Sequence, residues 1–219
     1  MRLVVFDIDG TLIDSVALIV ETVTAAFEAV GETAPEERAI RAISGITARD
    51  AMAILAPGAE SARVDEILAS YRREYGQRAG AEREPLFKGA LDALERLRGR
   101  EDTVLAVATG KSHRGAMALL GAHGLIERFS SIQTPDQNRG KPDPQMIESA
   151  MTHAGIGHEH TVLVGDTVHD MKMAKAAGVG AIGVGWGYHS TADLLAAGAD
   201  VIIHDWDELD AGVDQLAGA

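Results

Sequence analysis

The sequence contains no cysteine and very few aromatic residues. Without cysteine, disulfide bridges, thiolate catalysis and cysteine-based zinc sites are excluded. Aromatic residues make up only 4% of the 219 residues, so the core has to be built mainly from alanine, valine, leucine and isoleucine. The same shortage speaks against a protein that stacks the bases of single-stranded nucleic acid on aromatic side chains.

Basic residues are also scarce. There are 20 lysine and arginine residues against 33 aspartate and glutamate residues, which gives a formal net charge of −13. Such an acidic surface repels phosphate backbones and anionic lipid headgroups, so neither nucleic acid nor a membrane is an expected partner. An acidic protein that handles phosphate groups needs a local cation at its site, and a divalent metal ion would supply one.

Long apolar runs are absent as well. No stretch approaches the roughly 18 uninterrupted apolar residues of a membrane-spanning helix. The first residues, MRLVVFDIDGT, reach an acidic side chain at Asp7, too early for the apolar region of a signal peptide. We therefore expect a cytoplasmic protein.

Five short apolar segments are expected to form buried strands. They are continuous rather than alternating, as in a sheet that is covered on both faces. Between them lie helical patterns, such as residues 112–123 and 144–154. This alternation of strands and helices is typical of a parallel, doubly wound α/β sheet. The five segments are residues 3–6, 104–108, 162–164, 181–184 and 201–203.

One long stretch, residues 15–83, contains no convincing strand. Apolar residues recur at helical spacing from 16 to 30 and again from 64 to 75, which predicts two amphipathic helices. Between them, Thr47 with Asp50 three residues later resembles the start of a helix.

This helical stretch is too long to be a simple crossover between two strands. We therefore predict two domains. An α/β core domain would comprise residues 1–14 and 84–219, and a smaller helical domain, residues 15–83, would be inserted after the first strand.

Polar residues stand at the ends of three expected strands. Asp7 and Asp9 follow the first strand, Thr109 follows the second, and Asp166 follows the third. In an open α/β sheet, ligands bind beyond the carboxyl ends of the strands, so these side chains are expected to share one rim. Each residue alone could be a helix cap or a turn residue, but together they indicate a functional site.

Four acidic residues are expected to gather at that rim. Asp7 and Asp9 are two positions apart, so in extended backbone their side chains point to the same side. Asp166 and Asp170, in GDTVHD, add two carboxylates across the crevice. Because four clustered carboxylates repel one another without a cation, the sequence predicts an oxygen-rich site of the kind that Mg²⁺ prefers.

Two lysines complete the expected charge balance. Lys141 lies in the turn-rich segment RGKPDP just before a helical pattern, and Lys111 follows Thr109 and Gly110. A lysine that points into a carboxylate cluster offsets the charge of a nucleophile and of a bound phosphoryl group. The alternative, a solvated lysine at the surface, stays open for both.

Four motifs, in this order, resemble those of the haloacid dehalogenase superfamily. The resemblance covers essentially the whole chain and implies a Rossmann-like α/β core. The helical insert resembles the C1 cap of that family, with a hinge near Asp14 and Ser15. Opening and closing of the cap would admit substrate and then exclude water. The motifs are DIDGT (7–11), ATG (108–110), KPDP (141–144) and GDTVHD (165–170).

The resemblance implies covalent phosphoryl transfer. Asp7 would attack phosphorus to form an aspartyl-phosphate, and Asp9 would protonate the leaving oxygen and then activate the hydrolytic water. Thr109 and Lys141 would hold the transferring phosphoryl oxygens. The implied Mg²⁺ ligands are Asp7, the backbone carbonyl of Asp9, Asp166 and, directly or through water, Asp170.

Within the superfamily, the sequence favours phosphatases. Dehalogenases lack the second aspartate of the first motif, which is present here as Asp9. Phosphonatases use a cap lysine, whereas the first lysine here is Lys88, after the cap. The mutase branch has a histidine early in the cap, and the first histidine here is His113. The segment 185–209 resembles the phosphoglycolate phosphatase and pyrophosphatase-like branch.

The cap loop SGITAR, residues 44–49, is the expected specificity loop. Gly45 would permit close approach, and Arg49 would bind a substrate anion. From the core, Gly110 and Lys111 would also contact the substrate. An ordinary solvated role for Arg49 is an equally open alternative.

The expected function is Mg²⁺-dependent hydrolysis of a small phosphorylated metabolite, most similar to phosphoglycolate. The alternatives are a pyrophosphatase or sugar-phosphate phosphatase of the same fold. A non-catalytic binding or regulatory domain is the rival from another class. The sequence leaves the oligomeric state open between monomer and homodimer.

Overall fold

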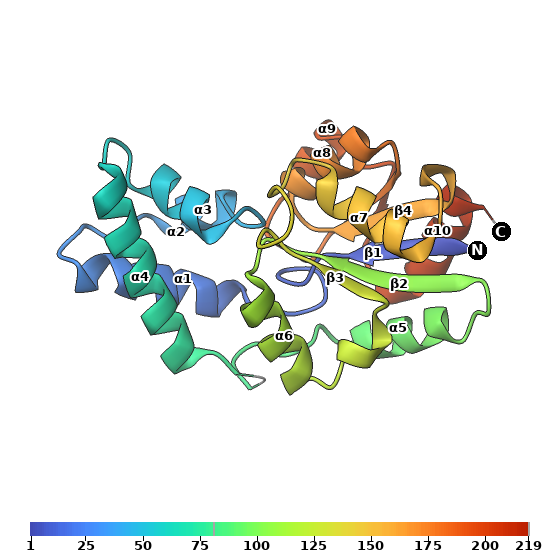
Figure 1. Cartoon of the computed structure of the whole chain (residues 1–219), viewed down its shortest axis with the longest axis horizontal. Helices are drawn as coiled ribbons and strands as arrows, with labels where there is room; N and C mark the ends of the chain where they lie inside the picture. The colour runs from blue at the N-terminus through green and yellow to red at the C-terminus, as the bar shows by residue number, and fades with distance from the viewer. Residues whose placement is uncertain (81, 219) are drawn as a thin grey trace.

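A parallel sheet runs through the larger part of the molecule, and a separate group of helices stands beside it (Figure 1). The computed structural model describes residues 1–80 and 82–218. Residues 81 and 219, which belong to the predicted insert and the predicted core, lie outside this description. The N-terminus and the last described residues lie at the same end of the sheet, away from the separate helices (Figure 1).

The six strands are arranged in the order β3-β2-β1-β4-β5-β6, and every neighbouring pair is parallel. The order reverses direction between β1 and β4, as it does in doubly wound folds. The predicted fold class is therefore confirmed. The strands are β1 (Arg2–Phe6), β2 (Thr103–Ala108), β3 (Ser131–Gln133), β4 (Thr161–Gly165), β5 (Gly180–Val184) and β6 (Val201–Ile203).

All five expected strands are present, and β3 is the one that the sequence does not indicate. It forms an edge of the sheet and is only three residues long. All three residues are partly exposed, and two of them, Ser131 and Gln133, are polar. Such a strand carries no continuous apolar run and therefore escapes detection.

Helices cover both faces of the sheet. In β1, Val4 and Phe6 belong to a buried cluster with side chains of α5, α6 and α10, whereas Leu3 and Val5 belong to a second cluster with side chains of α7, α8 and α9. Burial on both faces explains why the strand is apolar throughout. These helices are α5 (Ala90–Arg98), α6 (His113–Ala122), α7 (Gln145–Ala154), α8 (Val168–Ala177), α9 (Thr191–Ala196) and α10 (Leu209–Ala217), with 3₁₀ turns at Ile126–Arg128, His158–His160 and Trp206–Glu208.

The insert between β1 and α5 is helical, as expected. It has its own buried apolar cluster, which includes Phe27, Met52 and Ile67. Thr47 caps α3, because its hydroxyl accepts a hydrogen bond of 3.2 Å from the backbone N–H of Asp50. None of the described helices is both long and apolar enough to cross a membrane. The helices of the insert are α1 (Val16–Ala29), α2 (Glu37–Ala42), α3 (Ala48–Leu55) and α4 (Ser61–Arg78).

Two linkers join the insert to the sheet, and they pair with each other. The backbone N–H of Asp14 donates to the carbonyl of Pro85 at 2.8 Å, and that of Phe87 donates to Leu12 at 3.0 Å. The pairing fixes the insert beyond the end of β1, where the carboxyl ends of the strands point toward it (Figure 1). This arrangement places helices of the insert next to the rim at which the motif residues were expected.

Candidate active site

The first motif begins with a carboxylate that is almost fully buried. Asp7 directly follows β1 and is 1% exposed. Its backbone N–H donates to the carbonyl of Val164 at 3.0 Å, which extends the pairing of β1 with β4 into the motif. Its Oδ1 lies 2.8 Å from Nζ of Lys141. Apart from this ion pair, neither carboxylate oxygen accepts a hydrogen bond from the described residues.

Lys141 lies between two carboxylates of the rim. Its Nζ is 2.7 Å from Oδ1 of Asp170 and 2.8 Å from Oδ1 of Asp7, and its side chain is completely buried. Burial alone would lower the pKa of Lys141, but Asp170 and Asp7 outweigh it and raise the pKa. Of the two expectations for this lysine, the structure supports the one in which it points into the carboxylate cluster.

Asp166 directly follows β4 and is held by two hydrogen bonds. Its Oδ1 accepts from the hydroxyl of Thr11 at 2.9 Å, and its Oδ2 accepts from the backbone N–H of Tyr188 at 2.8 Å. Burial, followed by the charges of Asp170 and Asp7, raises its pKa well above the ordinary value. The first motif and the loop after β5 thus both orient this carboxylate.

Asp170 lies in the first turn of α8 and forms a capping box with Thr167. Its Oδ2 accepts hydrogen bonds from the backbone N–H of Thr167 at 3.1 Å and from its hydroxyl at 2.6 Å. The other oxygen, Oδ1, lies beside Lys141. The helix cap therefore fixes the orientation of this carboxylate at the rim.

The residues of this rim fit a hard divalent cation. Asp7, Asp166 and Asp170 are buried, and each offers one oxygen within 4.8 Å of the other two. Burial raises the pKa of Asp7 to about 7; Lys141 opposes this rise, and Asp170 and Asp9 add to it. Carboxylate oxygens are the ligands that Mg²⁺ prefers, and a divalent cation would relieve the repulsion among these groups.

Thr109 and Gly110 come from the loop after β2. Thr109 is 1% exposed, and its backbone N–H donates to the carbonyl of Gln133 at 3.1 Å. Its hydroxyl accepts a hydrogen bond of 3.2 Å from the backbone N–H of Lys111. A Cβ at Gly110 would lie 2.6 Å from the carbonyl oxygens of both Gly45 and Ile46. Only glycine fits between this loop and the insert.

The loop 44–47 of the insert lies directly against the core rim. Gly45 has a φ of +91°, and a Cβ there would lie 2.8 Å from the hydroxyl of Thr167. A Cβ at Gly140 would lie 2.6 Å from Cγ2 of Thr47. The insert therefore contacts the loop containing Gly110, the segment before Lys141 and the start of α8, and it closes over this side of the site.

A second polar cluster lies beside Asp9. Nζ of Lys111 is 3.0 Å from Oδ1 of Asp9 and 3.7 Å from Oε1 of Glu84, and it donates a hydrogen bond of 2.8 Å to the hydroxyl of Tyr75. The Tyr75 hydroxyl in turn donates to Oε1 of Glu84 at 2.5 Å. We call Asp9, Lys111, Tyr75 and Glu84 the Lys111 cluster.

Neither Tyr75 nor Glu84 stands in a motif that would assign it to a site from the sequence. Tyr75 belongs to the apolar stripe of α4, where it stacks on Tyr71. Glu84 lies in the second linker and is 1% exposed. The one available signal is an acidic residue at a domain junction, and it becomes informative only when its burial is known.

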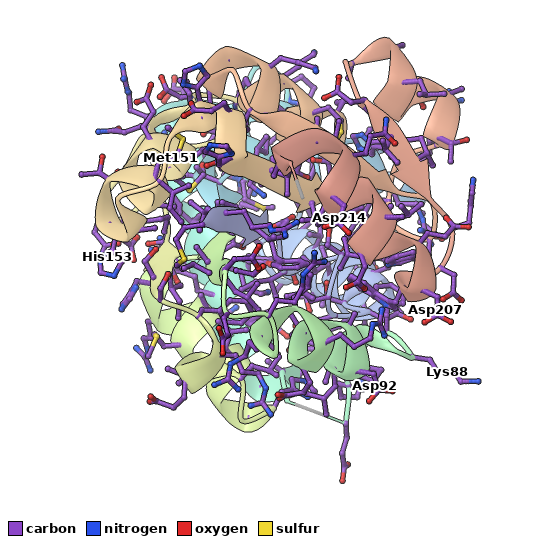
Figure 2. All side chains as sticks on the ribbon, turned by 90° about the vertical axis from the view of Figure 1, so that its right-hand side faces the viewer. Lys88, Asp92, Met151, His153, Asp207 and Asp214 are labelled. Carbon is purple, nitrogen blue, oxygen red and sulfur yellow. The ribbon has the colours of Figure 1, made fainter. Side chains whose placement is uncertain are left out.

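Arg49, expected to bind a substrate anion, has other partners. Its guanidinium lies 3.1 Å from Oδ1 of Asp65 and donates to the hydroxyl of Ser61 at 2.9 Å. Both partners lie on α4 within the insert, and the side chain is half exposed. No described polar contact links Arg49 to the core. Lys88 is exposed and projects away from the body of the molecule (Figure 2).

The sequence also matches a known family over most of its length. The family described as haloacid dehalogenase-like hydrolase matches residues 4–184. Probable phosphatase IndB of Dickeya dadantii (strain 3937) is 39% identical over 210 residues, which cover 94% of this chain and 91% of that protein. Phosphoglycolate phosphatase of Pseudomonas putida is 32% identical over 209 residues, which cover 93% of this chain and 76% of that protein.

The fold agrees with this match. A haloacid dehalogenase-like family hydrolase from Streptococcus pneumoniae superimposes with a TM-score of 0.84 at 26% sequence identity. The superposition covers 96% of this chain and 97% of that one.

Proposed function

Because this chain is a phosphatase of the haloacid dehalogenase-like hydrolase family, we propose that it hydrolyses a small phosphate monoester in a Mg²⁺-dependent reaction through an aspartyl-phosphate at Asp7. The observation that carries the proposal is the burial of Asp7 at the end of β1. There its carboxylate lies beside Lys141 and within reach of Asp166 and Asp170.

Asp7 and Asp9 divide the chemistry between them. An oxygen of Asp7 forms a bond to phosphorus, and the bond to the leaving oxygen breaks with both electrons going to that oxygen. Asp9 donates a proton to the leaving oxygen. It then takes a proton from the water that attacks the aspartyl-phosphate, which releases phosphate and restores the carboxylate of Asp7.

Thr109 and Lys141 bind the transferring phosphoryl group. The ammonium of Lys141 offsets part of its charge, and the hydroxyl of Thr109 donates a hydrogen bond to one of its oxygens. Asp7, the carbonyl of Asp9, Asp166 and Asp170 would hold the metal ion. When bound, Mg²⁺ supplies charge neutralisation at the phosphoryl oxygens.

We also propose that residues 15–83 act as a cap domain on a core formed by residues 1–14 and 84–219. The contacts of Gly45 with Thr167 and of Thr47 with Gly140 support a closed position of the cap. In that position the cap excludes bulk water from the aspartyl-phosphate, and movement at the paired linkers admits the substrate.

The substrate belongs to the small phosphorylated metabolites. A phosphoglycolate-like ester is the expectation from the resemblance, and three similar proteins are named phosphoglycolate phosphatase. Pyrophosphate and sugar phosphates are the alternatives within the same chemistry. A non-catalytic role is disfavoured because Asp7, Asp9, Thr109, Lys141 and Asp166 are all present at the rim.

A panel of phosphate monoesters, assayed with the full chain, tests the proposal. Phosphate release is expected with Mg²⁺, loss of activity with excess chelator, and recovery when Mg²⁺ is restored. Activity that persists after chelation would contradict the metal requirement. Inactivity across the whole panel with Mg²⁺ present would favour the non-catalytic role.

A further inference from the structure

The leaving-group side of the active site is identified by Asp9. In the proposed mechanism this residue protonates the leaving oxygen, so the remainder of the leaving group has to lie near its carboxylate. Among the described residues, Lys111 is the ion-pair partner of Asp9, and it also contacts Tyr75 of the cap and Glu84 of the linker.

The positive charge of the Lys111 cluster is already neutralised by its own carboxylates. One ammonium, that of Lys111, lies between two carboxylates, at 3.0 Å from Asp9 and 3.7 Å from Glu84. Glu84 is 1% exposed, so water screens its charge poorly. While Asp9 holds the proton that it donates, Glu84 alone neutralises Lys111. A carboxylate or phosphate on the leaving group would then give the cluster a net negative charge, and like charges placed together at a binding site are strongly disfavoured.

Among the described residues, no other lysine or arginine forms an ion pair with Asp9 or Glu84. Lys141 is paired with Asp7 and Asp170, where the transferring phosphoryl group binds. Arg49, the expected anion-binding residue of the cap, is paired with Asp65 on the surface of the insert. Among the described residues, an anionic leaving group would therefore have only Lys111 as a counter-charge.

The hydrogen-bonding groups of the Lys111 cluster also favour a leaving group that carries a hydrogen-bond donor. The Tyr75 hydroxyl already accepts from Lys111 and donates to Oε1 of Glu84. The second oxygen, Oε2, is buried and accepts no hydrogen bond from the described residues. A hydroxyl group on the leaving alcohol can donate to such an oxygen, whereas a carboxylate or phosphate offers only acceptors.

We propose that the Lys111 cluster selects a neutral, hydroxyl-bearing leaving alcohol over an anionic one, with Glu84 as the residue that sets this preference. The inference rests on the proposed phosphatase function and narrows its substrate class to phosphate esters of polyols and sugars. It ranks 2-phosphoglycolate and pyrophosphate below such esters, against the expectation from the resemblance.

Two substrates of nearly equal size test the preference. 2-Phosphoglycolate and 2-hydroxyethyl phosphate differ mainly in that a carboxylate replaces a hydroxymethyl group, and pyrophosphate adds a second kind of anionic leaving group. With the full chain and Mg²⁺, kcat/KM is expected to be about tenfold or more higher for 2-hydroxyethyl phosphate than for either anionic substrate.

The variant Glu84→Gln tests which residue sets the ratio. It removes one negative charge while keeping the shape of the side chain, so the kcat/KM ratio is expected to move about tenfold toward 2-phosphoglycolate. A structural role alone would change both rates together and leave the ratio constant. Glu74→Gln is the matched control, because Glu74 lies on α4 next to Tyr75 and is paired with Arg78; its ratio should stay within about twofold of wild type.

The outcomes separate this inference from the proposed function. A wild-type enzyme that prefers 2-phosphoglycolate or pyrophosphate would overturn the inference and leave the phosphatase function standing. The same holds for a Glu84→Gln ratio equal to that of wild type. Inactivity toward the whole panel would overturn both. The wild-type ratio needs no variant, so it decides the preference even where Glu84→Gln fails to fold.

Discussion

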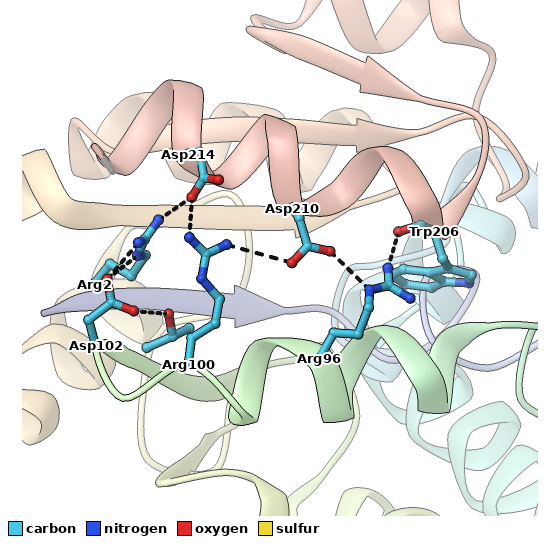
Figure 3. Close-up of polar contacts among 8 residues, drawn as sticks. Arg2, Arg96, Arg100, Asp102, Trp206, Asp210 and Asp214 are labelled. Carbon is cyan, nitrogen blue, oxygen red and sulfur yellow. Dashed lines mark hydrogen bonds and ion pairs between the residues drawn. The ribbon is translucent and has the colours of Figure 1, made fainter.

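The two ends of β1 carry charged clusters of opposite character. At its start, Arg2 pairs with Asp102 at 2.5 Å and with Asp214, and Arg100 pairs with Asp214 at 2.6 Å (Figure 3). These carboxylates are partly exposed, and each has a guanidinium partner. At the other end of the strand, Asp7 is buried among further carboxylates.

The two clusters shift carboxylate pKa values in opposite directions. The hydrogen bond from Arg2 lowers the pKa of Asp102, and those from Arg100 and Arg2 outweigh the effect of burial and lower that of Asp214. Burial instead raises the pKa of Asp7 and of Asp166. At one end, carboxylates that each have a guanidinium partner stabilise the fold. At the other end, three clustered carboxylates lie beside a single lysine, and such an excess of buried acidic groups is characteristic of a functional site.

The largest expected effect comes from the buried end. Asp7→Asn removes the proposed nucleophile, so kcat should fall by about 10⁴-fold or more. The fold should remain intact, because Lys141 keeps Asp170 as its partner and no buried charge is left unpaired. Steady-state kinetics and circular dichroism measure the two effects. Asp214→Asn, at the opposite end of the strand, is the control and should keep kcat within about twofold of wild type.

The stability of the metal-free protein should depend on pH through the buried carboxylate of Asp7. The pKa of Asp7 is about 7 in the folded protein against 3.8 ordinarily, so the folded state holds this proton more tightly. The Asp7 contribution to stability is therefore expected to decline as pH rises from about 4 to about 7. Added Mg²⁺ should stabilise the protein most above that range, where it competes least with protons.

Thermal unfolding with chelator and with Mg²⁺, at several pH values, measures this dependence. The comparison of wild type with Asp7→Asn isolates the carboxylate, because the variant should lack its share of the decline. A metal-free wild type whose pH profile equals that of Asp7→Asn would contradict the assignment.

The cluster at the start of β1 should affect stability and leave catalysis unchanged. Arg2→Met removes the partner of two carboxylates, so unfolding should become easier by about 1 kcal/mol, or roughly 2–4 °C in melting temperature. Activity should stay close to wild type. A large loss of kcat without a loss of stability would contradict the claim that the cluster at the start of β1 serves stability alone.

The smallest expected effect comes from an exposed ion pair at the edge of the arginine–aspartate cluster near the start of β1. Asp207 is 89% exposed and lies 3.6 Å from Arg96. Asp207→Asn should change the free energy of unfolding by less than about 0.5 kcal/mol, because water screens such a pair. Calorimetry of Asp207→Asn and of Arg2→Met compares their free energies of unfolding. The difference shows how much an ion pair contributes when its arginine is buried and has two partners rather than one exposed partner.

The features of β1 and of the motif that follows it could be predicted from the sequence. Asp7 and Asp9 are detectable because their spacing and their place after an apolar strand depend only on local geometry. Both faces of β1 are covered, and this makes the strand visible as an unbroken apolar run.

Other features depend on contacts between distant segments. In the sequence, Tyr75 is recognisable only as part of the apolar stripe of a helix. Its contact with Lys111 forms when the insert packs against the core. The pairing of Arg49 with Asp65 is likewise set by how α3 packs on α4. Residue type and spacing indicate which chemistry is available, but tertiary packing decides which side chains carry it out.

The covalent intermediate at Asp7 is the central claim, and chemical trapping tests it most directly. The enzyme is quenched with acid during turnover with Mg²⁺ and an active ester, then reduced with borohydride, and the peptide that contains residue 7 is analysed by mass spectrometry. An acyl phosphate at Asp7 predicts homoserine at that position, absent from the Asp7→Asn sample and from enzyme without substrate. Unmodified Asp7 under quench conditions that retain a burst of product, or homoserine at another aspartate, would contradict it.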